Sequence, residues 1–263
     1  MIDLFELYLA EDSPYGDETA DLLGLEGNGR LRIMTREHGV AACMDDLRNF
    51  YEKKGLTVVN SFKNGEEFNP HDVVFEAQGD IPTLFLLWRF SQTFLSMVCA
   101  IASKTRYTVE LARKVNPDVM IATTRKTHPG FRKYELKAVK IGGGVNHRNS
   151  LSDSVQISQN HFNVIEELGD IRSMKKIEIE PDTIEDAFKY APIADILMLD
   201  HSSPEEMREI VPKLREANPK LEIAIAGIDI AKISDYAEIV DIIVTTAPYY
   251  APPLDMSTKI RKL

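Results

Sequence analysis

Short apolar runs in the first hundred residues indicate a mixed α+β unit. Strands are expected at residues 31–34, 56–61 and 73–77, where alternating or β-branched apolar positions are bounded by turn residues. Helical spacing of apolar residues predicts a helix at 44–51. A long apolar segment starts near Pro82, a residue that fits the first turn of a helix, and is expected to continue to about Lys114. We therefore expect an α+β N-terminal domain, sandwich-like, over residues 1–105.

The pattern changes after Asn116-Pro117, where short apolar runs alternate with helical stretches. The runs occupy residues 119–122, 155–158, 176–180, 196–199, 221–225 and 239–244. Between two of them, Pro204-Glu205-Glu206 has the composition of a helix N-terminus. Apolar strands that alternate with helices are typical of a parallel sheet covered by helices, so the expected class is α/β.

Six or seven such units fit a (β/α) barrel, complete or incomplete, over residues 106–263. An open sheet is less favoured because no GxGxxG motif follows the first strand. A return of the C-terminal segment to the N-terminal domain stays open.

The chain is acidic, with a net charge of −10 over 263 residues. Nucleic-acid binding depends on neutralising phosphates with Lys and Arg, so we expect no nucleic-acid partner. An anionic ligand would instead need a local basic pocket. Cys43 and Cys99 lack CxxC spacing, which predicts two buried thiols in a reducing compartment.

The apolar segment 84–102 requires a test for membrane insertion. Arg89 and Gln92 fall inside it, and an arginine at mid-span costs about 2.5 kcal/mol or more in a bilayer. The N-terminus also lacks the basic-then-apolar order of a signal peptide. We therefore expect a buried or interface helix, no membrane, and a cytoplasmic location.

Two loops carry adjacent cations where strands of the expected barrel end. Thr124-Arg125-Lys126-Thr127 follows the strand at 119–122, and Gly142-Gly143-Gly144 precedes His147-Arg148. Arginine offers a planar fork and lysine a point charge for carboxylate or phosphate. Each loop alone is also typical of a solvated turn, but the two together indicate a basic pocket in an acidic protein.

Carboxylates and small polar residues follow the later strands. Glu178 and Glu180 share a strand face by period two, and Asp200 closes the next strand. Acids opposite a basic pocket suggest Mg²⁺ held by carboxylates and substrate phosphates, or else structural ion pairs. The last two strands end in Ala226-Gly227 and Thr245-Thr246, where many barrels hold a phosphate.

These segments resemble the quinolinate phosphoribosyltransferase family, whose activity is that of nicotinate-nucleotide pyrophosphorylase (carboxylating). The resemblance spans nearly the whole chain and is carried by residues 122–130, 137–148 and 178–180. Pro14-Tyr15-Gly16-Asp17 and the segment 246–251 look closer to the molybdenum-associated ModD branch. The resemblance implies an incomplete, seven-stranded barrel and a homodimer in which the N-terminal domain of one subunit covers the barrel of the other.

The resemblance also implies roles for individual residues. Phosphoribosyl pyrophosphate and a small aromatic carboxylate would be the substrates, Lys126, Glu180 and Asp200 would be catalytic, and Glu180 and Asp200 would hold Mg²⁺. Arg89 would reach the site of the partner subunit. Substrate binding would involve Thr124, Arg125, Lys126, His147, Arg148, Ser158, Ala226, Gly227, Thr245 and Thr246.

Some positions depart from the family pattern. Ser158 stands where the family usually has lysine, the Ser-Gly-Gly phosphate turn reads Ile225-Ala226-Gly227, and Thr245 or Thr246 replaces a glycine. The hypotheses are therefore a quinolinate enzyme of NAD synthesis, a ModD-type transferase with another acceptor, and, less favoured, a non-catalytic ligand sensor. His128 and His161 are interpreted as structural.

Overall fold

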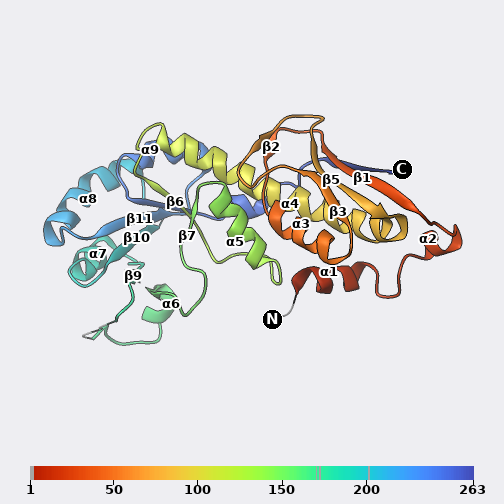
Figure 1. The fold of residues 1–263 in the computed structure, drawn as a ribbon. Helices are drawn as coiled ribbons and strands as arrows, with labels where there is room; N and C mark the ends of the chain where they lie inside the picture. Colours follow the sequence, from red (N-terminus) through yellow and green to blue (C-terminus); the bar gives the residue numbers. More distant parts are fainter. Residues whose placement is uncertain (1–2, 170, 172, 201) are drawn as a thin grey trace. The chain divides into compact units, whose positions relative to one another are not determined.

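The computed structural model describes residues 3–169, 171, 173–200 and 202–263, and they form two compact units (Figure 1). Unit 1 comprises residues 1–104, 131–142 and 250–263, and unit 2 comprises residues 105–130 and 143–249. The long helix α4 (Ile81–Arg113) contributes residues to both units. Each unit is described by itself below.

Unit 1 is built on a four-stranded antiparallel sheet in the order β13-β1-β5-β3. The strands are β1 (Asn28–Thr35), β3 (Thr57–Ser61), β5 (Val73–Asp80) and β13 (Met256–Lys262). A small two-stranded sheet pairs β2 (Gly39–Val40) with β4 (Glu67–Phe68). The helices are α1 (Leu4–Asp12), α2 (Glu18–Leu22), α3 (Met44–Lys53), α5 (Arg132–Ile141) and the first part of α4. The C-terminal strand β13 pairs with β1 over its whole length, from Gly29–Lys262 to Thr35–Met256.

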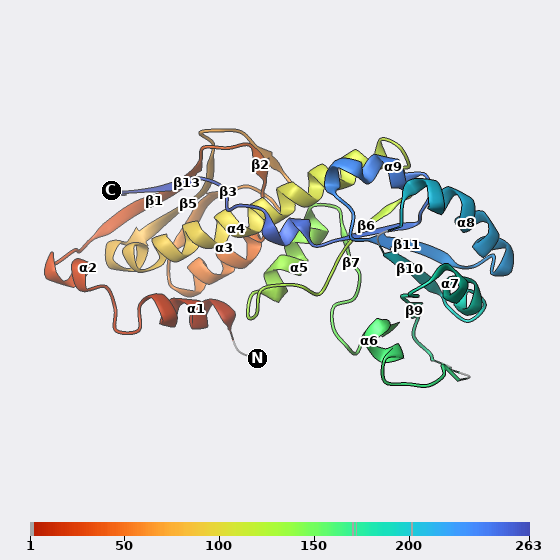
Figure 2. The ribbon, with the colours of Figure 1, turned by 180° about the vertical axis from the view of Figure 1, so that it is seen from behind.

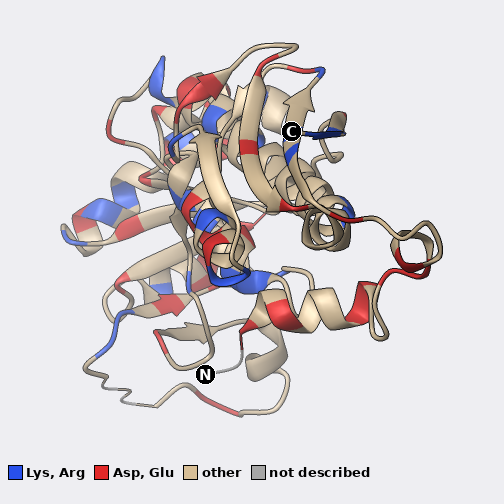
Figure 3. Cartoon of the chain, turned by 45° about the vertical axis from the view of Figure 1, so that its right-hand side comes forward, with Lys and Arg blue, Asp and Glu red and all other residues tan. Residues whose placement is uncertain are grey.

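Alternation of burial along β1 explains how the sheet covers its core. Leu31 and Ile33 are fully buried, while their neighbours on the other face are exposed or partly buried. An aromatic cluster joins helices α1, α3, α4 and α5, and in it the Phe5 and Tyr134 rings stack with centroids 5.1 Å apart. Acidic residues recur along α1 and α2 (Figure 3).

By length and composition, α4 is the one helix among the described residues that could cross a membrane. Its side chains nevertheless form part of the core, because 61% of the most apolar stretch is buried. Leu84, Leu87, Leu95 and Val98 are fully shielded from solvent. The prediction of a buried helix is confirmed.

Unit 2 is a seven-stranded parallel sheet in the order β7-β6-β12-β11-β10-β9-β8 (Figure 2). Its strands are β6 (Met120–Thr123), β7 (Val145–Asn146), β8 (Val155–Ile157), β9 (Ile177–Ile179), β10 (Ile196–Asp200), β11 (Glu222–Ala226) and β12 (Ile242–Thr245). The helical segments are α6 (Gln159–Phe162), α7 (Ile184–Tyr190), α8 (Pro204–Ala217), η1 (Ile230–Lys232), α9 (Ile233–Ala237) and η2 (Ala247–Tyr250). The expected α/β class and incomplete seven-stranded barrel are confirmed, after a mixed domain with an antiparallel sheet.

Two aspartates fix the starts of neighbouring strands in unit 2. Asp195 accepts a hydrogen bond from the Ile177 backbone N–H at 2.7 Å, and Asp241 accepts one from Ile223 N–H at 2.7 Å. Each carboxylate precedes its own strand, so it sets the register of two adjacent strands through one backbone group. Parallel strands whose starts are aligned in this way also end close to one another, at the opposite edge of the sheet.

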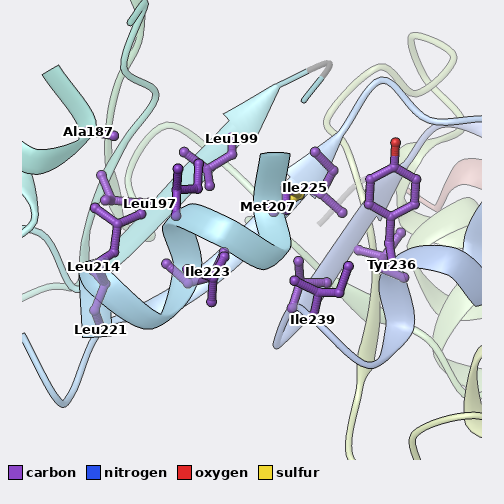
Figure 4. Close-up of a cluster of buried hydrophobic side chains, with 14 of the residues drawn as sticks. Ala187, Leu197, Leu199, Met207, Leu214, Leu221, Ile223, Ile225, Tyr236 and Ile239 are labelled. Atoms are coloured by element: carbon purple, nitrogen blue, oxygen red, sulfur yellow. The ribbon is translucent and has the colours of Figure 1, made fainter. Parts of the chain in front are cut away.

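The two faces of this sheet have different partners. Leu197, Leu199, Ile223 and Ile225 point toward the helices and form the main core with side chains such as Met207 of α8 (Figure 4). Alternate residues form a smaller apolar cluster on the other face, made of Ala122, Met198, Ala224, Ile242 and Val244. Period-two alternation therefore gives every strand one face for packing and leaves its other face for the interior of the half-barrel.

Candidate active site

Polar residues gather where the strands of unit 2 end. In a parallel sheet all carboxyl ends lie at one edge, so residues that follow different strands become neighbours. The backbone confirms this closeness: His147 N–H donates to the Thr123 carbonyl at 3.1 Å, and Thr124 N–H donates to the Thr245 carbonyl at 3.2 Å. Three segments that are distant in sequence thus meet at this edge.

An open pocket of about 760 Å³ lies within unit 2 at this edge. Five of the residues expected at the site line it: Arg125, Lys126, Arg148, Ser158 and Glu180. The other lining residues are Leu151, Ser154, Val155, Gln156, Gln159, Asn160 and His161. The two cationic loops and one of the expected carboxylates therefore share one cavity.

The interior face of β8 and β9 is polar, unlike the same face of β10 to β12. Gln156 lies directly opposite Glu178 in the parallel pair of β8 and β9. Two residues further along each chain segment, on the same face, Ser158 and Glu180 follow these strands and line the pocket. This change from apolar to polar side chains locates the ligand-binding part of the half-barrel at its β8–β9 side.

His147 and Glu178 form a buried pair across the half-barrel. His147 Nε2 contacts Glu178 Oε2, and the two side chains are 8% and 5% exposed. The strands concerned, β7 and β9, are not neighbours in the sheet. The other carboxylate oxygen of Glu178 has no hydrogen-bond partner among the described residues. The expected role of His147 in substrate binding stays a prediction, and its Nε2 contacts Glu178.

The carboxylates at this edge influence one another. Burial raises the pKa of Glu180, and the nearby charges of Asp200 and Glu178 raise it further, against the opposing effect of Lys126. Asp200 ends β10 and is exposed. Burial and the neighbouring Arg125 guanidinium hold the pKa of Arg148 below its ordinary value. Like charges are thus crowded on both sides of the pocket, which is typical of sites that bind charged ligands.

The described residues include no group of three or more His, Cys, Asp or Glu side chains placed to hold a metal ion. Mg²⁺ does not require such a group, because it keeps several waters and uses one or two carboxylates with substrate phosphates. Glu180 and Asp200 are two mutually repelling carboxylates, and a cation between them would relieve that repulsion. The residues present therefore fit a substrate-bridged Mg²⁺.

The expected phosphate-binding segments lie on the middle strands. Thr124 Oγ1 and Thr246 Oγ1 are 3.0 Å apart, and Ala247 N–H donates to Thr245 Oγ1 at 3.1 Å. Gly227, after Ala226 at the end of β11, has a φ of +71°, which favours glycine over other residues. Hydroxyls and a left-handed turn are thus presented next to each other on β6, β11 and β12.

Arg89 lies in unit 1, on the exposed side of α4. Its guanidinium stacks on the neighbouring Trp88 ring, 4.0 Å from the ring centre. Stacking holds the long side chain without using up the planar donor fork.

Sequence reasoning overlooked several lining residues, namely Gln156, Gln159 and Asn160. Uncharged amides give no charge signal, and only the strand period places Gln156 on the same face as Glu178. His161, interpreted as structural, also lines the pocket, where its ring accepts a hydrogen bond from the Ser158 backbone N–H at 3.1 Å.

Comparison with known families agrees with this architecture. Residues 17–99 match the model of the quinolinate phosphoribosyl transferase N-terminal domain, and residues 101–259 match that of the C-terminal domain. The chain belongs to the quinolinate phosphoribosyl transferase family. It is therefore a phosphoribosyltransferase, and the resemblance seen in residues 122–130 and 137–148 is confirmed at the level of the family.

Relatives in both branches cover almost the whole chain. A probable nicotinate-nucleotide pyrophosphorylase (carboxylating) of Archaeoglobus fulgidus is 35% identical, over 94% of this chain and 99% of that protein. A putative pyrophosphorylase ModD of Pasteurella multocida is 28% identical, over 97% and 95%. Membership of the family is shown. The expected closeness to the ModD branch is not, because the ModD relative is less similar than the pyrophosphorylase relative.

Solved structures of the family share the fold. NadC from Streptococcus pyogenes superposes with a TM-score of 0.88 at 27% identity, covering 98% of this chain and 96% of that one. The nicotinate-nucleotide pyrophosphorylase from Francisella tularensis gives a TM-score of 0.88 at 26% identity, with coverage of 98% and 96%. Both units therefore have counterparts in these enzymes.

Proposed function

We propose that this protein is a Mg²⁺-dependent transferase that moves the phosphoribosyl group of phosphoribosyl pyrophosphate to the ring nitrogen of a small aromatic carboxylate. The pocket that contains Arg125, Lys126 and Arg148 beside Glu180 carries this proposal. Three cations in one cavity of an acidic protein suit anionic substrates, and the adjacent carboxylate suits a metal or ribose hydroxyls.

The first acceptor to consider is quinolinate, which would make the protein a nicotinate-nucleotide pyrophosphorylase (carboxylating) of NAD biosynthesis. The name of the Archaeoglobus relative supports this acceptor. A second candidate is a ModD-type reaction with a different acceptor, supported by Ser158, which contributes an uncharged hydroxyl to the pocket. A sensor without catalysis is less favoured because it would not need Glu180 and Asp200.

The reaction follows from charge and orientation. Arg125, Lys126 and Arg148 hold the acceptor by its carboxylate so that the ring nitrogen faces ribose C1, which is an effect of positioning. The C1–O bond to pyrophosphate breaks with its electron pair leaving on oxygen, and the nitrogen lone pair forms the new bond to C1. Fixed cations around the leaving group stabilise the charge that develops there. No covalent enzyme intermediate is needed.

Glu180 and Asp200 are the residues proposed to hold the metal. A Mg²⁺ ion held by these carboxylates would supply positive charge to offset that of the pyrophosphate. Thr245, Thr246, Ala226 and Gly227 are proposed to accept the 5-phosphate of the donor through hydroxyl and backbone N–H groups.

The resemblance further supports a cytoplasmic homodimer. Arg89, exposed on α4 and stacked on Trp88, is proposed to enter the active site of the partner subunit. His147 is proposed to contribute to binding through the ring that Glu178 holds in place.

The test compares two lysine variants in an assay of pyrophosphate release from phosphoribosyl pyrophosphate, Mg²⁺ and quinolinate or another aromatic carboxylate. Lys126→Ala removes a charge-assisted contact of about 1.5–3 kcal/mol, so kcat/KM should fall by about 10–150-fold. Lys213→Ala, which removes an exposed lysine paired with Glu209 on α8, should change kcat/KM less than twofold, which corresponds to about 0.4 kcal/mol. A fully active Lys126→Ala enzyme would refute the site.

A further inference from the structure

The pocket that binds the acceptor is electrically one-sided. Its cations come from the loops after β6 and β7, namely Arg125, Lys126 and Arg148. The wall formed by β8 and α6 contributes Ser154, Gln156, Ser158, Gln159, Asn160 and His161, which carry hydroxyl, amide or imidazole groups. Between Arg148 and Arg172 the sequence contains no lysine or arginine.

His161 is tied to Ser158 on this wall. The backbone N–H of Ser158 donates to His161 Nδ1 at 3.1 Å, and Ser158 Oγ lies 3.1 Å from the same nitrogen. Because Nδ1 accepts this hydrogen bond, Nε2 is the ring nitrogen that remains to donate to a ligand.

Gln159 adds an amide to the same wall. Its Oε1 is shielded from solvent and has no hydrogen-bond partner among the described residues. An amide group both donates and accepts hydrogen bonds. The wall thus combines the imidazole of His161 with amide and hydroxyl groups, which together complement an uncharged group that donates and accepts, such as a carboxamide.

We propose that the acceptor carries one carboxylate, bound by the cationic side, and one uncharged group with both a donor and an acceptor, such as a carboxamide, bound by the Ser158–Gln159–His161 wall. This inference rests on the proposed phosphoribosyl transfer and favours the second candidate acceptor over a dicarboxylate. A second carboxylate would face this wall, whose lining residues include no lysine or arginine to compensate its charge, which is unfavourable.

The bond changes are those of simple N-ribosylation. The C1–O bond of the donor breaks, pyrophosphate leaves with the electron pair, and the ring nitrogen supplies the pair for the N–C1 bond. The carboxamide remains on the ring, and so does a carboxylate that is not next to the ring nitrogen. Where the carboxamide occupies the carbon next to the nitrogen, no CO₂ is released, because that group does not leave its bonding electrons on the ring as a carboxylate does.

The experiment measures kcat/KM for quinolinate and for its two monoamides, with phosphoribosyl pyrophosphate and Mg²⁺, by pyrophosphate release. We expect kcat/KM of the wild-type protein to be about tenfold or more higher for one monoamide than for quinolinate, because the polar groups of the site would match that monoamide. Ser158→Lys places a cation on the neutral wall and should shift the preference toward quinolinate by about tenfold or more.

Ser152→Lys is the matched control, because Ser152 is exposed in the same segment and does not line the pocket. It should leave the preference unchanged. A wild-type preference for quinolinate, or a preference that Ser158→Lys and Ser152→Lys leave equally unchanged, overturns the inference while the proposed transferase activity stands. If none of the aromatic carboxylates causes pyrophosphate release, the proposed function is overturned together with the inference. The wild-type comparison does not depend on whether a variant folds.

Discussion

The buried contact between His147 and Glu178 makes a quantitative prediction about stability. The side chains are 8% and 5% exposed, so neither partner regains water when the other is removed. His147→Ala would strand a buried carboxylate that already has one unpartnered oxygen. Breaking such a pair costs about 3 kcal/mol, the lower end of the usual range. For a domain of this size that corresponds to a fall in Tm of about 6–12 °C.

Glu178→Gln keeps the shape of the side chain and replaces a charge-assisted hydrogen bond by a neutral one. This substitution should lower the free energy of unfolding by about 1 kcal/mol. In the His147→Ala background the same substitution removes the stranded charge, so His147→Ala/Glu178→Gln should melt above His147→Ala. The effect of Glu178→Gln thus changes sign with its partner, which independent sites cannot do.

Differential scanning calorimetry at fixed pH and ionic strength measures these shifts. His38→Ala is the matched control, because His38 and Glu67 form a histidine–glutamate contact of 3.6 Å in which both side chains are more than half exposed. Its Tm should change by no more than about 2 °C. Equal falls in Tm for His147→Ala and His38→Ala would show that the buried pair is not coupled. The same would follow if the fall in Tm of the double variant equalled the sum of the falls of its two single variants.

Three further predictions concern other described residues. Because the pKa of Glu180 is raised above its ordinary value of 4.5, this group stabilises the fold at pH values below 4.5 and loses that contribution as pH rises through the folded pKa. Glu180→Gln should therefore have the higher Tm at pH 8, with the difference shrinking toward pH 4.5; a constant difference would contradict this. Tyr249→Phe removes a buried hydrogen bond of 2.7 Å to Thr123 Oγ1 and should lower the free energy of unfolding by about 1–2 kcal/mol in urea titrations, and an unchanged midpoint would be the opposite result. Burial raises the pKa of Cys99 to about 12 and raises that of Cys43 as well, so a thiol reagent should modify neither in the native protein and both in denaturant; rapid native labelling would refute this.

The positions of the long elements could be predicted from sequence because their apolar pattern matches their burial. The run at 221–225 coincides with β11, whose odd-numbered side chains pack against helices. Ser203 and Glu206 form a capping box at the start of α8, where Pro204 indicated a helix N-terminus. In these segments local preference and tertiary packing agree, so the sequence pattern alone is sufficient.

Other elements have no such local signal. β7 is only Val145–Asn146, follows a run of glycines and has an exposed valine, so it carries no apolar pattern. β13 is a strand because β1 offers it hydrogen-bond partners more than two hundred residues away in sequence. Pairings of this kind depend on topology, which periodicity does not encode.

The candidate site divides in the same way. Arg125, Lys126, Arg148 and Glu180 were predicted from charge and from their place after strands, and they line one pocket. The contact of His147 with Glu178 joins non-adjacent strands, so it could not be predicted from spacing.

The central claim is that the pocket transfers a phosphoribosyl group to a ring nitrogen. Its most direct test is to incubate the full-length protein with Mg²⁺, ¹³C-labelled phosphoribosyl pyrophosphate and an aromatic carboxylate, and to follow ribose C1 by NMR. The account predicts a new resonance for C1 bonded to nitrogen, formed in equal amount with pyrophosphate. Unchanged phosphoribosyl pyrophosphate with quinolinate and both of its monoamides, or conversion to ribose 5-phosphate alone, would contradict it.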